Sequence, residues 1–433
     1  PAHIGNFRTF VLQDVFRRVL EVIGQPHTHV RNLTDVDDKT IGQSRDLGLP
    51  LAEVTAHWTA RFQADCEALN LLSPHIEPSA VAHIPEQIAL IEKLVAKGHA
   101  YQTDDGSVYF KVDSFPPYGA LSRLKERSIT TSTVDREQSD EYERDSAADF
   151  ALWKARRPED RDNYWPSPFG EGRPGWHVEC SAMSMKHLGE SFDLHSGGVD
   201  LIFPHHENEI AQSEAATGQP FVRHWFHITH LLVDGRKMSK SLGNLYTLDD
   251  IRDEGFTAEE LRYVLLSGSY RQQLNFTWGS LAVARKALAR LRDLQARLGG
   301  SAVALRRGSA GGELSCFTCV IEALLDDLNT PEALGRLFTT VKSINKALDE
   351  RTLAPAQIEI ERRGFAQVLK AFGFEFTAQE TEAAPDSVQA LAARRWQAKQ
   401  DRDWATADAL RDELKAAGWT TKDGKEDYEL LSL

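Results

Sequence analysis

The chain has 433 residues, of which 41% are hydrophobic and 26% are charged, ordinary values for a globular protein of several domains. Its formal net charge of −14 argues against a general nucleic-acid coat, but it allows a protein that meets RNA through local basic patches. No apolar run approaches the roughly 20 residues of a membrane span, no signal peptide is evident, and four cysteines are too few for a disulfide framework. We therefore expect a monomeric cytoplasmic protein without a membrane partner.

Hydrophobic periodicity in the first hundred residues predicts helices that alternate with strands. Residues 8–23, 51–71 and 85–97 show helical spacing, and residues 27–33 form a short strand candidate. Such alternation favours a parallel α/β sheet of the Rossmann type. A Rossmann core needs a strand before its first helix, and Pro1 stands directly before that helix, so we expect the first strand to lie upstream of Pro1.

The sequence changes character after this core-like region. Residues 100–149 combine short strand candidates with a charged run at 125–145, which indicates an insertion, and helical patterns dominate after residue 245. We therefore predict an α/β Rossmann-type catalytic core with an insertion, followed by a mostly α-helical C-terminal half, with linkers near 299–312 and 378–385. The expected segments are 1–99, first half of the core; 100–149, insertion; 150–235, second half of the core with a metal site; 236–298, a lysine loop and helices; 299–385, a helical bundle; and 386–433, a C-terminal unit.

A four-residue motif, His-Ile-Gly-Asn at residues 3–6, stands immediately before the first predicted helix. A helix N-terminus offers free N–H groups and the positive end of the helix dipole, which suits a phosphate. Gly5 would let the backbone approach a nucleotide closely, and His3 and Asn6 can donate hydrogen bonds to phosphate oxygens. The alternative is that His3 is an ordinary residue at a helix start.

A second motif, Lys-Met-Ser-Lys-Ser at residues 237–241, follows an apolar run. Lys237 and Lys240 would place mobile positive charge over a phosphate leaving group, unless they belong to a solvated surface loop. The two motifs are similar, in the same order, to the HIGH-type and KMSKS-type signatures of class I aminoacyl-tRNA synthetases. Between them, Gly198 and Asp200 provide either a close approach to ATP, with Asp200 accepting from a ribose hydroxyl, or only a turn.

Three residues of metal-ligand type stand in two apolar segments. His205 and Glu209 are four residues apart, so a helix would place them on one face, and Cys180 closes the stretch 175–180. Sulfur, nitrogen and oxygen ligands of this kind hold Zn²⁺. Spacing alone does not exclude His206 as the histidine ligand, a purely structural zinc site, or a solvated His–Glu ion pair without a metal.

Longer strings extend the resemblance to nearly the whole chain, now to the cysteinyl-tRNA synthetase family. The strings are NLTDVDDK at 32–39, PGWHVECSAM at 174–183, FPHHENE at 203–209, KMSKSLGN at 237–244 and DDLNTP at 326–331. In the last of these, Leu328 stands where the family usually has Phe. The resemblance implies one Zn²⁺ per chain, and the ligands that it implies are Cys180, His205 and Glu209, together with a Cys upstream of Pro1.

By the same resemblance, Thr34 and Trp176 line the amino-acid pocket, ATP with Mg²⁺ is a substrate, and tRNA(Cys) is the acceptor. A zinc site can bind the thiolate of L-cysteine directly, whereas serine offers a harder alcohol that stays protonated. Shape alone separates near-isosteres by only about 1–3 kcal/mol. We therefore expect the metal to select cysteine, and we expect no editing domain.

The helical half is expected to brace the tRNA stem and, in its last unit, to read the anticodon. Each basic residue there is better explained as a solvated helix residue than as a phosphate contact, and the tail at 424–428 departs from the usual family ending. Three tryptophans could stack on unpaired bases, although we expect at least two of them in the core. The basic residues are Arg285, Arg290, Arg292, Arg297, Arg394, Arg395 and Lys399. The tryptophans are Trp396, Trp404 and Trp419.

The remaining cysteines carry no predicted chemistry. Cys316 and Cys319 form one C-x-x-C at helical spacing, and the second pair that a four-cysteine zinc site would need is missing. We expect both to be core residues, like Cys66.

Three functions are compatible with these residues. The favoured one is ligation of cysteine to tRNA(Cys) through an enzyme-held adenylate. A related cysteine ligase that acts on an amino sugar would share the core and the zinc site but would need no anticodon-reading unit, so residues 386–433 argue against it. The third is a tRNA-binding protein without catalysis.

Overall fold

A computed structural model describes residues 1–124, 149–239, 241–299, 315–376, 385–423 and 427–432. The charged run at 125–145, Lys240, most of both expected linkers and residues 424–426 lie outside the described residues. The chain forms two compact units, Pro1–Glu375 and Phe376–Leu433, which we describe separately. The finer division into six segments stays a prediction.

The helices that periodicity predicts near the N-terminus are confirmed. The first begins earlier than expected, at Ile4, because the side chain of His3 caps it. The strand expected at 27–33 is reduced to two isolated parallel bridges, Val30 with Ile76 and Leu33 with Ser79. The elements are α1 (Ile4–Val22), α2 (Asp38–Leu47), α3 (Leu51–Ala68), the 3₁₀ turn η1 (Val81–His83) and α4 (Ile84–Ala96).

A four-stranded antiparallel sheet follows α4, in the order β1-β2-β3-β4. It joins β3 and β4, which we expected in the second half of the core, to the two strands of the expected insertion. Single 3₁₀ turns lie at Val112–Ser114 and Pro158–Asp160. The strands are β1 (Ala100–Gln102), β2 (Val108–Phe110), β3 (Phe150–Ala155) and β4 (Gly172–Pro174).

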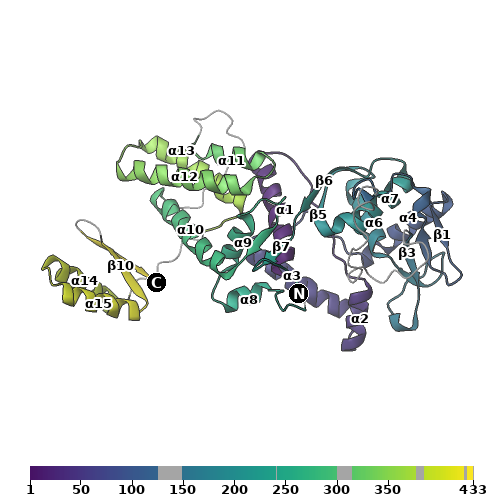
Figure 1. Cartoon of the computed structure of the whole chain (residues 1–433), viewed down its shortest axis with the longest axis horizontal. Coiled ribbons are helices and arrows are strands. Elements are labelled where there is room, and N and C mark those ends of the chain that lie inside the picture. Colours follow the sequence, from purple (N-terminus) through teal and green to yellow (C-terminus); the bar gives the residue numbers. More distant parts are fainter. Residues whose placement is uncertain (125–148, 240, 300–314, 377–384, 424–426, 433) are drawn as a thin grey trace. The chain divides into compact units, whose positions relative to one another are not determined.

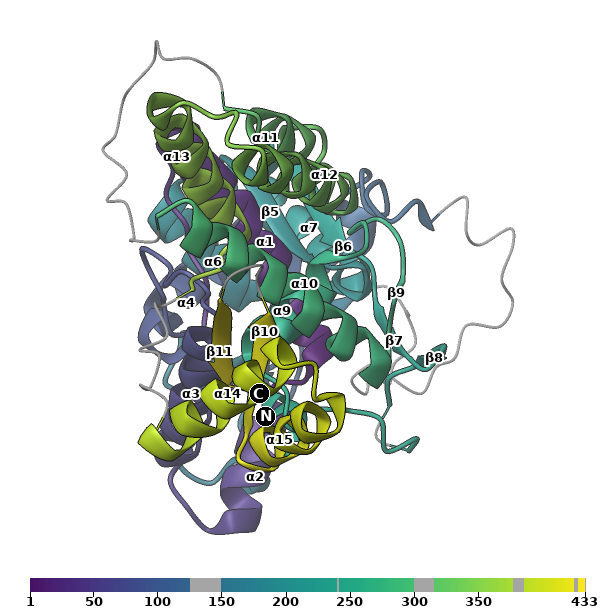
Figure 2. The same cartoon turned by 90° about the vertical axis from the view of Figure 1, so that its left-hand side faces the viewer.

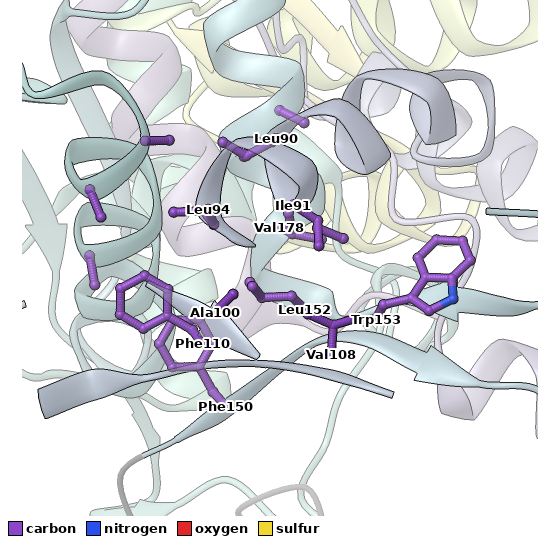
Figure 3. Packing of buried hydrophobic residues seen from close by; sticks show 14 of the residues in the cluster. Leu90, Ile91, Leu94, Ala100, Val108, Phe110, Phe150, Leu152, Trp153 and Val178 are labelled. Atoms are coloured by element: carbon purple, nitrogen blue, oxygen red, sulfur yellow. The ribbon is translucent and has the colours of Figure 1, made fainter. Parts of the chain in front are cut away.

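One hydrophobic cluster holds this sheet against two helices (Figure 3). Leu90 and Leu94 of α4 lie one helical turn apart and face Phe110 and Phe150 of the sheet, whose rings stack with centroids 4.9 Å apart. Val178, on α6 (Trp176–Leu188), belongs to the same cluster and is fully buried. Burial of each such side chain stabilises the fold by about 1.5–3 kcal/mol. The cluster therefore fixes α6, the helix that carries Cys180.

A parallel pair, β5 (Phe192–Gly198) and β6 (Val222–Ile228), forms the Rossmann-type part of the core (Figure 2). The chain passes from one strand to the other through a 3₁₀ turn (Val199–Leu201), a π-helical turn (Ile202–His206) and α7 (Glu207–Thr217). A third sheet has the order β8-β7-β9, with β7 antiparallel to β8 and parallel to β9. Its strands are β7 (Leu231–Val233), β8 (Arg236–Lys237) and β9 (Leu274–Phe276).

The rest of the first unit is helical, as predicted, and Figures 1 and 2 both show α11, α12 and α13 side by side. Arg262, fully buried on α9, ties this part to α1: it pairs with Asp14 and donates to the carbonyls of Leu69 (2.9 Å) and Phe372 (2.7 Å). The helices are α8 (Leu248–Asp253), α9 (Ala258–Leu266), α10 (Trp278–Arg297), α11 (Thr318–Leu325), α12 (Thr330–Asp349) and α13 (Pro355–Phe372).

One of the three cysteine predictions is confirmed. Cys66 is buried, but Cys316 is exposed and Cys319 is half-buried, so the prediction that both are core residues is wrong. Phe317 and Val320 occupy the buried positions there instead, which leaves the two cysteines on the other side of the turn.

The basic residues of α10 are engaged within the protein. Arg290 lies over the ring of Phe338, 4.8 Å from its centroid. The other three pair with carboxylates: Arg285 with Glu260, Arg292 with Glu259 and Arg297 with Asp349. Surface pairs of this kind contribute about 0–1 kcal/mol each.

The second unit consists of α14 (Asp386–Gln400), α15 (Trp404–Ala416) and an antiparallel hairpin of β10 (Trp419–Asp423) and β11 (Tyr428–Ser432). Its small core is Val388, Ala392 and Leu414. Half-buried Trp419 packs on that core, and half-buried Trp396 lies 5.6 Å from the ring of Tyr428. Trp404 is 60% exposed. In neither unit is any described helix both long and apolar enough to cross a membrane.

Candidate active site

A cleft of about 1620 Å³ lies where β5 and β6 end, against the N-terminus of α1 and one face of α6. The carboxyl ends of parallel strands are the usual place for ligands in α/β folds. Of the residues predicted from the sequence, Glu209 is buried behind the wall and Lys240 lies outside the described residues. The predicted residues that line the cleft are His3, Gly5, Asn6, Thr34, Trp176, Cys180, Gly198, Asp200, His205 and Lys237.

His3 and Asn6 form a reciprocal cap at the start of α1. The backbone N–H of Asn6 donates to Nδ1 of His3 (3.3 Å), and the backbone N–H of His3 donates to Oδ1 of Asn6 (3.0 Å). Burial lowers the pKa of His3, so its imidazole is neutral near pH 7. With Nδ1 accepting, the ring proton sits on Nε2, and Nδ2 of Asn6 is still able to donate. Both side chains can therefore offer N–H groups to an anion in the cleft.

Gly5 is needed where the lysine loop meets α1. A Cβ on Gly5 would lie 3.0 Å from both Sδ of Met238 and Nδ1 of His3, closer than ordinary contacts. The loop is also attached at its far end, because the N–H of Ile4 donates to the carbonyl of Tyr246 (2.8 Å). Lys237, at the end of β8, is exposed, so its ammonium group can reach a ligand above the helix start.

Gly198 is the last residue of β5, and Asp200 lies in the 3₁₀ turn that follows it. A Cβ on Gly198 would lie 2.3 Å from Oδ1 of Asp200, so any larger residue here would displace that carboxylate. That carboxylate lies in the cleft wall, 4.0 Å from Nδ1 of His230. An oxygen in this position can accept from a hydroxyl group of a ligand.

The structure brings Cys180, His205 and Glu209 together. One ligand atom from each lies within 4.8 Å of the others, and the side chains are 8%, 4% and 0% exposed. Nε2 of His205 lies 2.8 Å from Oε1 of Glu209, but poor alignment leaves that buried oxygen without a hydrogen bond. Tetrahedral zinc bonds of about 2.0–2.3 Å place ligand atoms about 3.5 Å apart. The sulfur, nitrogen and oxygen atoms therefore fit a zinc ion.

Neighbouring side chains orient the three candidate ligands. Nδ1 of His205 lies 2.9 Å from Nδ1 of His177, which leaves Nε2 of His205 directed to the cluster. Oε2 of Glu209 accepts from His195 at 2.9 Å, and Sγ of Cys180 lies 3.5 Å from Nδ2 of Asn32. Such partners fix the tautomer and the orientation of metal ligands.

The electrostatics of the cluster favour a cation. Burial opposes a charge on Glu209, but the imidazoles of His195 and His205 outweigh it and hold the pKa of that carboxyl well below its usual range. Burial, with Glu209 and Glu179 nearby, raises the pKa of the Cys180 thiol well above its usual range. A bound metal ion would offset that cost and stabilise the thiolate.

His206 belongs to a second possible metal group, with His195 and the same Glu209. Its Nδ1 lies 2.8 Å from Nε2 of His227, and burial lowers the pKa of His206 to about 2. The two groups share one carboxylate. The first group includes the sulfur of Cys180 and lines the cleft through Cys180 and His205, whereas His206 does not line the cleft.

Trp176 and Thr34 lie beside the metal cluster. The indole of Trp176 lies on the ring of His205, with centroids 4.2 Å apart, and Oγ1 of Thr34 accepts from Nδ2 of Asn32 at 3.4 Å. Sequence reasoning gave no role to Asn32, His177 or His195. The first two stand inside the strings that carry the resemblance, which was a usable signal, whereas His195 has no such marker.

Comparison with known proteins agrees with this geometry. Residues 1–286 match the family model described as tRNA synthetases class I (C) catalytic domain. Residues 319–377 match a DALR domain, and residues 381–428 match a cysteinyl-tRNA ligase anticodon binding domain. A cysteine–tRNA ligase of Opitutus terrae is 56% identical over 99% of this chain and 91% of its own length. One from Chlamydia pneumoniae is 45% identical over 98% and 90%.

Solved structures add the fold. A Mycobacterium tuberculosis methionyl-tRNA synthetase bound by methionyl-adenylate superposes with a TM-score of 0.58, covering 86% of this chain and 88% of its own, at 17% identity. Because the identity is so low, this match supports the fold alone. Together with the family model, it confirms the predicted class I core with a helical C-terminal half. The curated relatives and the match to an anticodon binding domain do not favour the amino-sugar or the non-catalytic alternative. The chain belongs to the cysteine–tRNA ligase family of class I aminoacyl-tRNA synthetases.

Proposed function

We propose that this chain charges tRNA(Cys) with L-cysteine in two steps, with a zinc ion on Cys180, His205 and Glu209 selecting the amino acid. The observation that carries the proposal is that this buried S, N, O cluster opens into the same cleft as the start of α1 and the end of β8. One end of the cleft can bind a thiol, and the other can bind phosphates.

In the first step, the carboxylate of cysteine attacks the α-phosphate of ATP, which is bound with Mg²⁺, and pyrophosphate leaves. His3 and Asn6 donate to phosphate oxygens at the N-terminus of α1, where the helix dipole adds positive potential. Lys237 and Lys240 neutralise charge that develops on the leaving group. Asp200 accepts from the ribose. No side-chain nucleophile is needed, because alignment and charge stabilisation carry the reaction.

Selection of cysteine is assigned to the metal end. The ion, when bound, supplies a bond to the substrate thiolate that the alcohol of serine does not match. Trp176 packs on His205 and limits the space beside it, and Thr34 lines the same cleft. Glu209, Cys180 and His205 are buried, so little of the metal end is exposed to solvent.

In the second step, the 3′ end of the tRNA receives the cysteinyl group. The matches of residues 319–377 and 381–428 to a DALR domain and an anticodon binding domain favour tRNA as the acceptor over an amino sugar. We assign anticodon reading to residues 386–433. The enzyme is proposed to act as a monomer in the cytoplasm.

The test is cysteine-dependent exchange of radioactive pyrophosphate into ATP, followed by aminoacylation of tRNA(Cys) with labelled cysteine. We expect both activities, and we expect serine to support neither. Exchange without tRNA charging, but with transfer to an amino sugar, would replace the proposal by the second function. No exchange in the folded full-length protein would support a non-catalytic role.

A further inference from the structure

Arg8 of α1 does not line the cleft, yet it is fully buried and donates to four backbone carbonyls. Nη1 reaches the carbonyls of Thr229 (2.7 Å) and His230 (2.7 Å). Nη2 reaches those of Ser269 (2.9 Å) and Gln272 (2.6 Å). A planar guanidinium with two terminal nitrogens is suited to hold two chain segments at once.

The charge of Arg8 has no carboxylate partner among the described residues. Burial lowers the pKa of Arg8 to about 10, so the group is still charged at neutral pH. An isolated buried charge is costly, and here the four carbonyl dipoles offset the cost. Arg262 of α9, which is also fully buried and contacts α1, has Asp14 as its counterion. The two arginines therefore differ in how their charge is compensated and in what they hold.

The carbonyls that Arg8 holds belong to two connections. Residues 229–230 link β6 to β7, and residues 267–273 link α9 to β9. The two connections are joined to each other, since the N–H of Thr229 donates to the carbonyl of Tyr270 (2.9 Å). Directly after them, β7 and β9 pair in parallel, with Leu231 opposite Leu274. Arg8 thus attaches the starting ends of both strands to α1.

The segment after β7 leads to the lysine loop, so the attachment made by Arg8 affects the position of that loop. The β7–β8 hairpin ends at Lys237, and the far end of the lysine loop is already attached to α1 through Ile4 and Tyr246. Arg8 supplies the attachment at the near end. The position of Lys237 relative to His3 is therefore set by contacts at both ends of the segment 229–246.

We propose that Arg8 is a positioning residue for amino-acid activation, which sets the separation between the phosphate-binding start of α1 and the strand pair that leads to Lys237. This inference rests on the proposed function. It predicts a defect in the rate of adenylate formation and none in the binding of cysteine, because the candidate zinc ligands lie on α6, on the π-helical turn Ile202–His206 and on α7, and the hydrogen bonds of Arg8 go to other segments.

The experiment measures pyrophosphate exchange, zinc content and melting temperature for Arg8→Lys and its matched control Arg262→Lys. Lysine keeps the charge but does not span both connections. For Arg8→Lys we expect kcat to fall about 100-fold, the loss typical of a displacement of about 1 Å, with KM for cysteine and zinc content within about twofold of the parent. For Arg262→Lys we expect a lower melting temperature and kcat within about threefold.

Arg8→Met is the second variant, because an unbranched apolar side chain fills similar space without the hydrogen bonds. We expect its kcat to fall at least as far as that of Arg8→Lys. Equal kcat losses in Arg8→Lys and Arg262→Lys would overturn the proposal, and so would loss of the fold in both Arg8 variants alone. An inactive parent protein would instead count against the proposed function.

Discussion

The two ends of the cleft are built in different ways. At the metal end, Cys180, His205 and Glu209 are nearly inaccessible, and each has a neighbour that fixes its orientation. At the nucleotide end, Asn6 and Lys237 are exposed, and the groups that would meet phosphate come from a helix start and a hairpin. The difference suggests a division of labour. We propose that the buried site selects the amino acid and that the exposed groups assemble around ATP.

Loss of a zinc ligand should have the largest effect. For Cys180→Ser we expect zinc content to fall to background and kcat/KM for cysteine to fall about a thousandfold, since metal stabilisation of this kind is worth several kcal/mol. Cys66→Ser is the matched control: it changes another buried cysteine, which belongs to neither metal group found among the described residues, and it should keep both zinc and most activity. Equal losses of zinc and activity in the two variants would contradict the assignment of the metal site to Cys180.

Removal of a charge at the nucleotide end should have a smaller effect on activity, and the effect should be on catalysis and not on zinc binding. Lys237→Ala should lower kcat for pyrophosphate exchange by about 100-fold, the cost of one electrostatic contact to a transition state. Zinc content and KM for cysteine should be unchanged. Arg236→Ala alters the neighbouring residue of the same strand, whose side chain points to the opposite face, and should retain activity within about threefold. A loss of zinc in Lys237→Ala would contradict the separation.

The pair His205 and His206 sharpens the description of the metal end. His205→Gln should weaken zinc binding, measured by competition with a chelator, by more than about 100-fold. His206→Gln should weaken it by about tenfold at most, the effect of a residue that only supports a ligand. The reverse order would move the ion to the group formed by His195, His206 and Glu209.

Gly5→Ala should have the smallest effect. Its Cβ would approach Met238 and His3 to 3.0 Å, so the lysine loop must shift by a few tenths of an ångström. We expect about a tenfold loss in kcat with normal zinc content. Gly335→Ala, on α12 with open space around it, is the control and should behave like the parent. A normal kcat for Gly5→Ala would mean that the loop does not depend on close contact with α1.

Sequence reasoning identified residues that the structure brings together at the candidate site, but it did not identify the residues that support them. The three candidate ligands were found because the Cys of one string and an i, i+4 His–Glu pair in another are side-chain signals. His195 lies on β5 and donates a hydrogen bond to Glu209 of α7, a pairing that sequence spacing does not reveal. The contacts of Arg8 are to backbone carbonyls, which leave no signal in the types of the contacted residues. The strand expected at 27–33 is only two bridges, and Cys316 is exposed. Both outcomes depend on tertiary packing, which the local sequence pattern does not report.

X-ray absorption at the zinc edge tests the central claim most directly, on the full-length protein with and without cysteine. The account predicts one Zn–S bond of about 2.3 Å for each cysteine ligand of the free enzyme. One further Zn–S bond should appear when cysteine is added, with no change when serine is added. Zinc that gains no sulfur ligand from cysteine, or that has no sulfur ligand at all, would contradict selection of the amino acid by the metal.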